Sequence, residues 1–349
     1  MVFKTSLNKA TIQLCPPTFA QNPLFMYLNR LLKSSLLLLT FLTATTFRVM
    51  AQTPSDAVMM KSGEICFGLN YGNSAWSEYW EGDSLRENGN IGTLTTQSIT
   101  GGFMLGILDR VNMIAMLPYV ITDPSAGVVA GDKGIQDAAF FVKGLIYEHK
   151  AGPDNIKFLA SAGLLLPASD YVPEHPFAIG LGCPDGIFRG IIHYDADMGL
   201  YGRVDGAFHL RGNAILDRNY YYTTSGYYSD EVDMPDAMDY NATIGYIFPS
   251  KHFKVEGVLN GFNTFGGFDI RRQDGGFPSN DMEAMRVGLN ADYYDLLVKG
   301  LAVHFNSNYT LTGRNVGKSM MFGGGISYQF GLWGKKDKAQ SSSPTPQAN

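Results

Sequence analysis

Apolar and polar residues alternate with a period of two along most of the chain beyond Ser62. The last segment shows this most clearly, because one face carries Phe322, Gly324, Ile326, Tyr328, Phe330 and Leu332 and the other carries glycine, serine and glutamine. Successive side chains of a β-strand point to opposite faces, so the pattern predicts strands with one apolar and one polar face. No helix-length window beyond Ser62 places apolar residues at i, i+3, i+4 and i+7. The chain is therefore predicted to be all-β.

About twelve segments carry this alternation, and their number is even. They lie near 62–72, 92–107, 110–121, 135–148, 155–168, 188–200, 203–216, 236–248, 252–266, 282–293, 296–311 and 319–333. Their lengths exceed the usual 5 to 6 residues of strands in globular proteins. Such lengths suit tilted strands that cross a bilayer and project beyond it.

The connections between these segments alternate in length. Those after the even-numbered segments are short, and those after the odd-numbered ones are long, except after the eleventh. Short turns at one rim and long loops at the other are typical of bacterial outer-membrane barrels, and strands in lipid must close because an unpaired edge cannot persist there. We predict a transmembrane antiparallel β-barrel of about 12 strands with up-and-down topology over 62–333. A soluble β-sandwich or a secreted β-helix is the alternative, which the apolar face on every predicted strand disfavours.

The two ends of the chain differ from this middle part. Residues 1–51 are predicted to be an upstream extension followed by a signal peptide from about Met26, with Arg30 and Lys33 before an uncharged stretch and a cut after Ala51. A transmembrane anchor is the alternative, but the uncharged stretch is shorter than the about 20 residues that a spanning helix needs. We expect 52–61 to be a short periplasmic segment and 334–349 a disordered polar tail.

Composition narrows the classes of function. Of the 349 residues 17% are charged and 40 are glycine, which departs from an ordinary soluble domain in both respects. The three cysteines show no C-x-x-C spacing, so no disulfide framework and no cysteine-based metal site is predicted. Removal of 1–51 would take away five basic and no acidic residues and change the net charge from −5 to −10. Such a chain is not expected to bind nucleic acid.

Five short motifs occur in order along the first half. They are Ser62-Gly63-Glu64, Gly106-Ile107-Leu108-Asp109-Arg110-Val111, Leu117-Pro118-Tyr119-Val120, Gly134-Ile135-Gln136-Asp137 with Lys143-Gly144, and Leu164-Leu165-Leu166-Pro167. In these motifs the chain resembles the bacterial outer-membrane proteins grouped as transporters of the phenol meta-cleavage degradation pathway, which are related in architecture to fatty-acid and toluene channels. The resemblance covers about 110 residues, with Gln136 and Ala168-Ser169 departing from it. It implies a channel for small hydrophobic compounds rather than phenol specifically.

The polar faces of the predicted strands supply candidate pore-lining residues. They are Asp137, Lys143, His193, Asp195, Asp197, Arg203, Asp205, His209, Arg211, Glu256, Arg286 and His304. Mixed charges of this kind can set up a transverse field that orders a polar solute in a pore. The structural alternative is a set of ion pairs across the lumen that fill and rigidify a narrow barrel. Asp195 and Asp197 share a face, which leaves metal binding open beside the simpler reading of a hydrated wall.

The predicted long loops are rich in aromatic residues. Trp76, Tyr79, Trp80, Tyr221 and Tyr227 are candidates for capture of an apolar or sugar-like ligand. Tyrosines near a barrel rim also serve as anchors at the membrane interface, which is the alternative. The acidic residues of these loops indicate a solvated rim, with calcium or lipopolysaccharide bridging as a further option.

No enzymatic activity and no cofactor is predicted. An outer-membrane lipase or acylase needs a nucleophile with an adjacent base, but all six histidines fall in turns, loops or inward faces and no Gly-x-Ser-x-Gly occurs. The sequence thus predicts a Gram-negative outer-membrane channel for passive uptake of small hydrophobic or aromatic compounds. A non-conducting structural or surface-interaction barrel is the alternative. The expected partners are outer-membrane lipid, lipopolysaccharide, the barrel-assembly machinery and a small solute.

Overall fold

The computed structural model describes residues 53–128, 130–175, 177–217, 221–222, 228–270 and 280–332, which all belong to one compact unit. The predicted signal peptide, the polar tail and Tyr227 lie outside these residues, as does the side chain of Tyr221. Among the residues described, no helix is long and apolar enough to cross a membrane.

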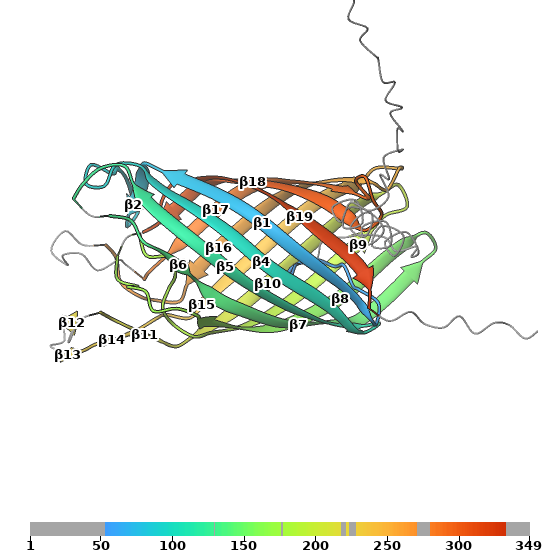
Figure 1. The fold of residues 1–349 in the computed structure, drawn as a ribbon, viewed down its shortest axis with the longest axis horizontal. Coiled ribbons are helices and arrows are strands. Elements are labelled where there is room, and N and C mark those ends of the chain that lie inside the picture. The colour runs from blue at the N-terminus through green and yellow to red at the C-terminus, as the bar shows by residue number, and fades with distance from the viewer. Residues whose placement is uncertain are drawn as a thin grey trace, which may run out of the picture. The chain divides into compact units, whose positions relative to one another are not determined.

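Twelve antiparallel strands close into a barrel (Figure 1). They are β1 (Glu64–Trp76), β4 (Leu94–Leu108), β5 (Val111–Pro124), β7 (Asp137–Ala151), β8 (Asp154–Pro167), β9 (Asp185–Asp195), β10 (Leu200–Arg211), β15 (Ala237–Ile247), β16 (Phe253–Thr264), β17 (Glu283–Tyr294), β18 (Leu301–Arg314) and β19 (Met320–Gly331). Each strand pairs with the next in sequence, and β1 pairs with β19 to close the sheet. This confirms the predicted all-β, up-and-down transmembrane barrel.

Seven further strands lie outside these twelve. They are β2 (Glu78–Glu81), β3 (Ser84–Glu87), β6 (Lys133–Ile135), β11 (Asn213–Ile215), β12 (Tyr221–Tyr222), β13 (Tyr228–Ser229) and β14 (Glu231–Asp233). All of them fall in the long connections, and β6 adds a short pairing to β5. The β2–β3 hairpin and the paired strands β11 and β14 lie at one end of the barrel, on the left in Figure 1. The opposite end carries the short turns, as the sequence predicted.

The outward face of the barrel is apolar. Large apolar side chains that point away from the lumen and are exposed occur around the wall, for example Phe67, Leu69, Phe140, Val142, Phe188, Ile192, Val204, Ile244, Leu259, Leu289, Phe305 and Ile326. Near the short turns, aromatic rings contact one another, with ring centroids 5.0 Å apart in Tyr246–Phe248 and 6.1 Å apart in Tyr147–Phe158. An apolar band flanked by an aromatic girdle is the surface that a barrel presents to lipid.

Several strand boundaries differ from the prediction by up to five residues, and turns explain two of them. The segment predicted as 188–200 ends at Asp195, because a turn over 196–199 includes Gly199 with a φ of 82° and closes with an Ala196 N–H to Leu200 carbonyl hydrogen bond of 2.8 Å. The segment predicted as 296–311 begins only at Leu301, after a turn whose Gly300 has a φ of 95°. In the first turn Ala196, Met198 and Leu200 continue the alternation, and in the second Leu296, Leu297 and Val298 extend the apolar stretch. The pattern alone therefore could not locate either strand end.

The segment preceding β1 packs inside the barrel instead of forming the predicted periplasmic segment. The fully buried Lys143 of β7 donates hydrogen bonds from Nζ to Asp56 Oδ1 at 2.7 Å and to the Thr53 carbonyl at 2.9 Å. Ala57 is buried in a cluster with Leu159 and Ile191 of the inner wall. We call residues 53–61 the luminal segment, and it fills part of the lumen near the short turns.

The first two motifs of the sequence fasten this segment to the wall. The Ser62 N–H donates to Asp109 Oδ1 at 3.1 Å, and its hydroxyl donates to the Ile107 carbonyl at 3.1 Å. A Cβ on Gly106 would lie 2.0 Å from the Lys61 carbonyl oxygen, so only glycine lets the segment pass this close to β4. These motif residues therefore have a structural role at the base of the barrel.

Candidate functional site

The candidate site is the polar inner wall formed by β9, β10, β15, β16, β17 and β18. Lys254 donates to Asp292 at 2.6 Å and lies 3.4 Å from Glu256. Glu256 also accepts hydrogen bonds from the Tyr201 hydroxyl at 2.6 Å and from Asn290 at 3.1 Å. Since all these side chains alternate inward from adjacent strands, their charges gather along one side of the lumen.

This network extends in both directions along the wall. Towards the long loops, Arg189 pairs with Asp205 and, at 2.6 Å, with Asp239. His209 bridges Asp239 at 2.9 Å and Asp185 at 2.8 Å. Towards the closing strands, the His304 ring contacts Asp292 and Ser327, each at 2.8 Å. The wall thus pairs most of its carboxylates with nearby donors, as burial of charge requires.

Two cavities lie between this wall and the luminal segment. The central cavity has a volume of about 390 Å³, and the cavity nearer the short turns has a volume of about 450 Å³. Four charged residues line both, namely Asp56, Arg203, Lys254 and Glu256. These four residues therefore mark the boundary between the cavities, and we call them the constriction.

The side of the central cavity opposite the charged wall has a different chemistry. It is lined by Met104 of β4 and by Ile114 and Met116 of β5, together with Gly68 and Gly102. Glycines and flexible methionines leave an apolar surface of low relief. Asn70 of β1 and Thr100 of β4 are the polar residues on this side. The cavity therefore has one charged side and one mainly apolar side, which suits a small solute with an apolar body and a polar group.

The structure places most of the predicted pore-lining residues on the inner wall. His193, Asp195, Arg203 and Glu256 line the cavity near the short turns, and Arg203, Asp205, Glu256 and His304 line the central one. His209 and Arg286 point inward nearer the long loops, where Arg286 donates to Asn260 at 3.1 Å. The sequence thus found most of the charged wall.

Three predicted pore-lining residues are placed differently. Asp197 lies exposed in the turn between β9 and β10, where its N–H contacts Asp154, so the prediction for Asp197 is corrected. Lys143 points inward but is covered by the luminal segment. Asp137 accepts a hydrogen bond of 2.5 Å from the Tyr171 hydroxyl of the β8–β9 loop, and burial together with this bond raises the pKa of Tyr171. Lys143 and Asp137 therefore hold other segments in place.

Asp195 and Asp197 do not form a metal site together. Asp195 contacts His193 at 2.7 Å and Lys157 at 2.9 Å, whereas Asp197 is in the turn beyond the strand. In the part of the chain that the structure describes, no group of three or more histidine, cysteine or acidic residues could hold a metal ion.

The candidate residues from the sequence did not include every residue of this site, and Arg189, Asp239 and Asp56 are examples. Arg189 and Asp239 share the inward face with His193 and Asn241, so the alternation assigns both to the lumen. Asp56 gave no such signal, because it lies outside any alternating segment. Its place in the lumen depends on its contact with Lys143, which is 87 positions away in the sequence.

The aromatic loop residues that are described pack against other loops. Trp80 is buried, with its N–H donating to the Val316 carbonyl at 2.9 Å, and the rings of Trp76 and Tyr79 lie 6.1 Å apart. Lys318 N–H donates to the Glu78 carbonyl at 2.8 Å in the same region. These aromatic residues join the first long loop to the β18–β19 connection, and only Trp76 and Tyr79 stay half-exposed.

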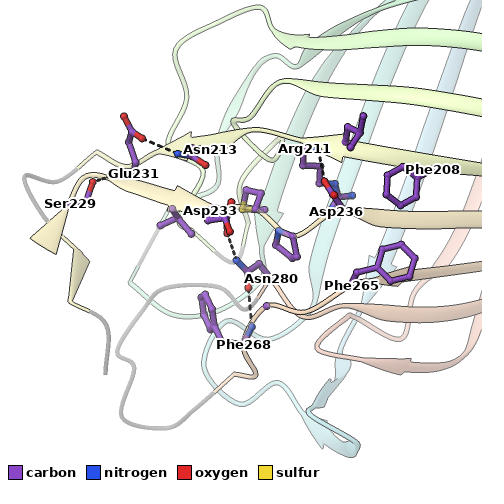
Figure 2. Close-up of a pocket in the computed structure, with 15 residues that line it drawn as sticks. Phe208, Arg211, Asn213, Ser229, Glu231, Asp233, Asp236, Phe265, Phe268 and Asn280 are labelled. Atoms are coloured by element: carbon purple, nitrogen blue, oxygen red, sulfur yellow. Dashed lines mark hydrogen bonds between the residues drawn. The ribbon is translucent and has the colours of Figure 1, made fainter. Parts of the chain in front are cut away.

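A third cavity, of about 1090 Å³, lies at the end of the barrel that carries the long loops (Figure 2). Its lining includes Phe208 and Phe265, which point outward and stack with ring centroids 5.7 Å apart. Asn280 closes another side by donating to the Asp233 carbonyl at 3.2 Å and accepting from Phe268 N–H at 3.0 Å. The predicted pore-lining Arg211, which lies inward on β10 with its Nε 3.7 Å from Asp185, also lines this cavity. The cavity therefore lies at the rim, where outward-facing and inward-facing side chains meet.

Comparisons with known proteins support the fold. The chain is similar to the crystal structure of an outer-membrane channel from Pseudomonas putida F1, with a TM-score of 0.63 and 12% identity over 80% of this chain and 100% of that one. Weaker similarity extends to the translocator domain of the autotransporter NalP from Neisseria meningitidis, with a TM-score of 0.40 and 10% identity over 87% of this chain and 96% of that one. No family model and no curated protein matches the sequence.

Proposed function

We propose that the protein is an outer-membrane channel for passive uptake of small hydrophobic or aromatic compounds. The observation that carries this proposal is the pair of cavities that meet at the constriction inside a closed barrel. A solute would pass between the luminal segment and the charged wall. Passage would be driven by its concentration gradient, without cofactor or chemical reaction.

The size and the lining of the cavities support a small solute with an apolar body. One side of the central cavity, which has a volume of about 390 Å³, is lined by Met104, Ile114 and Met116. Met104 and Ile114 are buried against Met60, and the half-buried Met116 can pack against a ring. The charged residues opposite would orient a polar substituent. The motif resemblance to transporters of the phenol meta-cleavage pathway agrees with this class of solute.

The same proposal places the barrel in the outer membrane of a Gram-negative cell after removal of the signal peptide. The apolar outward face supports a position in lipid. Insertion would then depend on the barrel-assembly machinery, and the long loops would face lipopolysaccharide. Of the predicted aromatic loop residues whose side chains the structure describes, the half-exposed Trp76 and Tyr79 remain candidates for ligand capture at the rim.

Reconstitution tests the channel directly. The protein lacking residues 1–51 is refolded into planar bilayers and into liposomes, and heat-modifiable mobility on a gel verifies that the barrel has folded. We expect small single-channel conductance in potassium chloride and uptake of a small aromatic compound without general leakage of sugars. Empty vesicles are the control.

A folded barrel without conductance and without uptake would contradict the channel. It would favour the alternative, a non-conducting barrel that acts through its surface. The observation in favour of that alternative is the luminal segment, whose buried contacts occupy part of the lumen.

A further inference from the structure

Arg203 occupies an exceptional place in the lumen. It lies on β10 with its side chain 10% exposed, and it lines both the central cavity and the cavity near the short turns. Any solute that moves from one cavity to the other therefore passes this guanidinium group.

The contacts of Arg203 with its neighbours are long. Its Nη1 is 3.4 Å from Glu256, its Nη2 is 3.3 Å from the Thr243 hydroxyl, and its Nε is 4.0 Å from Asp205. The Nε has no hydrogen-bond partner among the described residues. By comparison, Lys254 lies 2.6 Å from Asp292. Arg203 is thus a buried cation whose donors are incompletely used.

The carboxylates near Arg203 are engaged by other donors. Glu256 accepts hydrogen bonds from Tyr201 and Asn290 and lies beside Lys254. Asp205 pairs with Arg189 and accepts a hydrogen bond of 2.9 Å from Asn241. Because these acids retain other partners, an anionic group could take up the donors of Arg203 without leaving an acid unpaired.

A guanidinium group binds a carboxylate through two parallel hydrogen bonds, which makes arginine selective for planar anions. The apolar surface of Met104, Ile114 and Met116 lines the same central cavity. A small organic acid has both parts that this arrangement fits, a carboxylate for the charged wall and an apolar body for the opposite surface.

We propose, on the basis of the proposed channel function, that the lumen binds and passes small aromatic carboxylates and that Arg203 is the residue that receives the carboxylate. The solute exchanges its hydration for the donors of Arg203 and returns to water beyond the constriction. The contacts are non-covalent, and weak binding of this kind lets the solute leave as well as enter.

Ion selectivity in planar bilayers tests this proposal. Reversal potentials are measured across gradients of potassium benzoate, potassium acetate and potassium chloride, which give the permeability of each anion relative to potassium. We expect benzoate to exceed both acetate and chloride, because only benzoate offers a carboxylate together with an apolar ring. Benzyltrimethylammonium chloride supplies an aromatic cation of similar size, which we expect to be excluded.

Two substitutions of Arg203 separate its charge from its geometry. Arg203→Gln is expected to lower the permeability of benzoate relative to potassium about tenfold, because a factor of ten corresponds to the free energy of one charge-assisted hydrogen bond. Arg203→Lys keeps the charge but not the paired donors, so it should retain anion preference and lose the preference for carboxylate over chloride. Arg86→Gln is the matched control, since Arg86 is 56% exposed on the β2–β3 hairpin and should change nothing.

The outcomes distinguish this proposal from the channel function. A conducting wild type with equal permeability to benzoate, chloride and the aromatic cation would overturn the carboxylate site and leave the channel standing. Unchanged selectivity in folded Arg203→Gln and Arg203→Lys would also overturn the role of Arg203. Absence of any conductance in the folded wild type would instead overturn the channel itself.

Discussion

At the scale of single residues, Lys143 and Asp56 carry the attachment of the luminal segment. Lys143 has no exposed surface, and Asp56 lies 2.7 Å from its Nζ while also accepting the N–H of Val58 at 2.9 Å. Breaking a buried pair by removing one partner leaves an uncompensated charge, which costs more than the pair itself contributes.

Lys143→Met should therefore release the segment more readily than a paired substitution does. We expect it to cost about 3 kcal/mol, whereas Lys143→Met with Asp56→Asn together should cost less because no charge is left alone. Single-channel conductance measures the release, and urea unfolding in lipid vesicles measures the stability. Equal behaviour of the single and double variants would argue against the pair as the attachment.

Residue by residue, the sequence predicted the charged wall because a period of two assigns each side chain to a face. His193, Arg203 and Glu256 were assigned inward on this basis. The same rule could not identify Asp56, because its contact depends on where the chain enters the lumen. It also misplaced Asp197, since the alternation continues through the turn over 196–199.

At the scale of elements, the luminal segment narrows the passage without forming part of the sheet. Met60 is buried in a cluster with Met104 and Ile114, and Ser161 donates to the Pro54 carbonyl at 3.2 Å. No hydrophobic period marks the segment, so the sequence predicted only a short periplasmic stretch. The twelve strands, in contrast, each repeat the alternation often enough to be recognised.

Deletion of residues 53–60 should leave the barrel folded and should widen the passage through its lumen. We expect single-channel conductance to rise several-fold and liposomes to swell in sugars that the complete protein excludes, because the two cavities would merge with the space that the segment fills. Heat-modifiable mobility is the control for folding. Unchanged conductance in a folded deletion variant would show that the passage does not run beside the segment.

At the scale of the whole molecule, the apolar outward face determines where the barrel is stable. Leu69 lies near the middle of β1, is 52% exposed and pairs across the sheet with Gly101 and Ile326. A charge at this depth in a bilayer has no water to solvate it. The closed sheet leaves no edge in contact with lipid, so the outward side chains decide the stability in the membrane.

Leu69→Arg is expected to destabilise the folded barrel in lipid vesicles by about 2–4 kcal/mol. Leu85→Arg is the matched control, because Leu85 is 43% exposed on the β2–β3 hairpin beyond the twelve strands, and we expect little change there. Urea titration of tryptophan fluorescence in vesicles measures both. Equal destabilisation would mean that Leu69 does not face lipid.

The burial of the native thiols gives the molecule an internal reporter. Cys66 has no exposed surface and belongs to the same cluster as Met60 of the luminal segment, while Cys183 is 1% exposed in a loop where burial raises its pKa to about 11. Both thiols should be inert to a water-soluble maleimide while the segment is in place. When the segment departs, Cys66 alone becomes reachable from the lumen. Its labelling rate would then report the fraction of barrels from which the segment has departed, without any engineered probe.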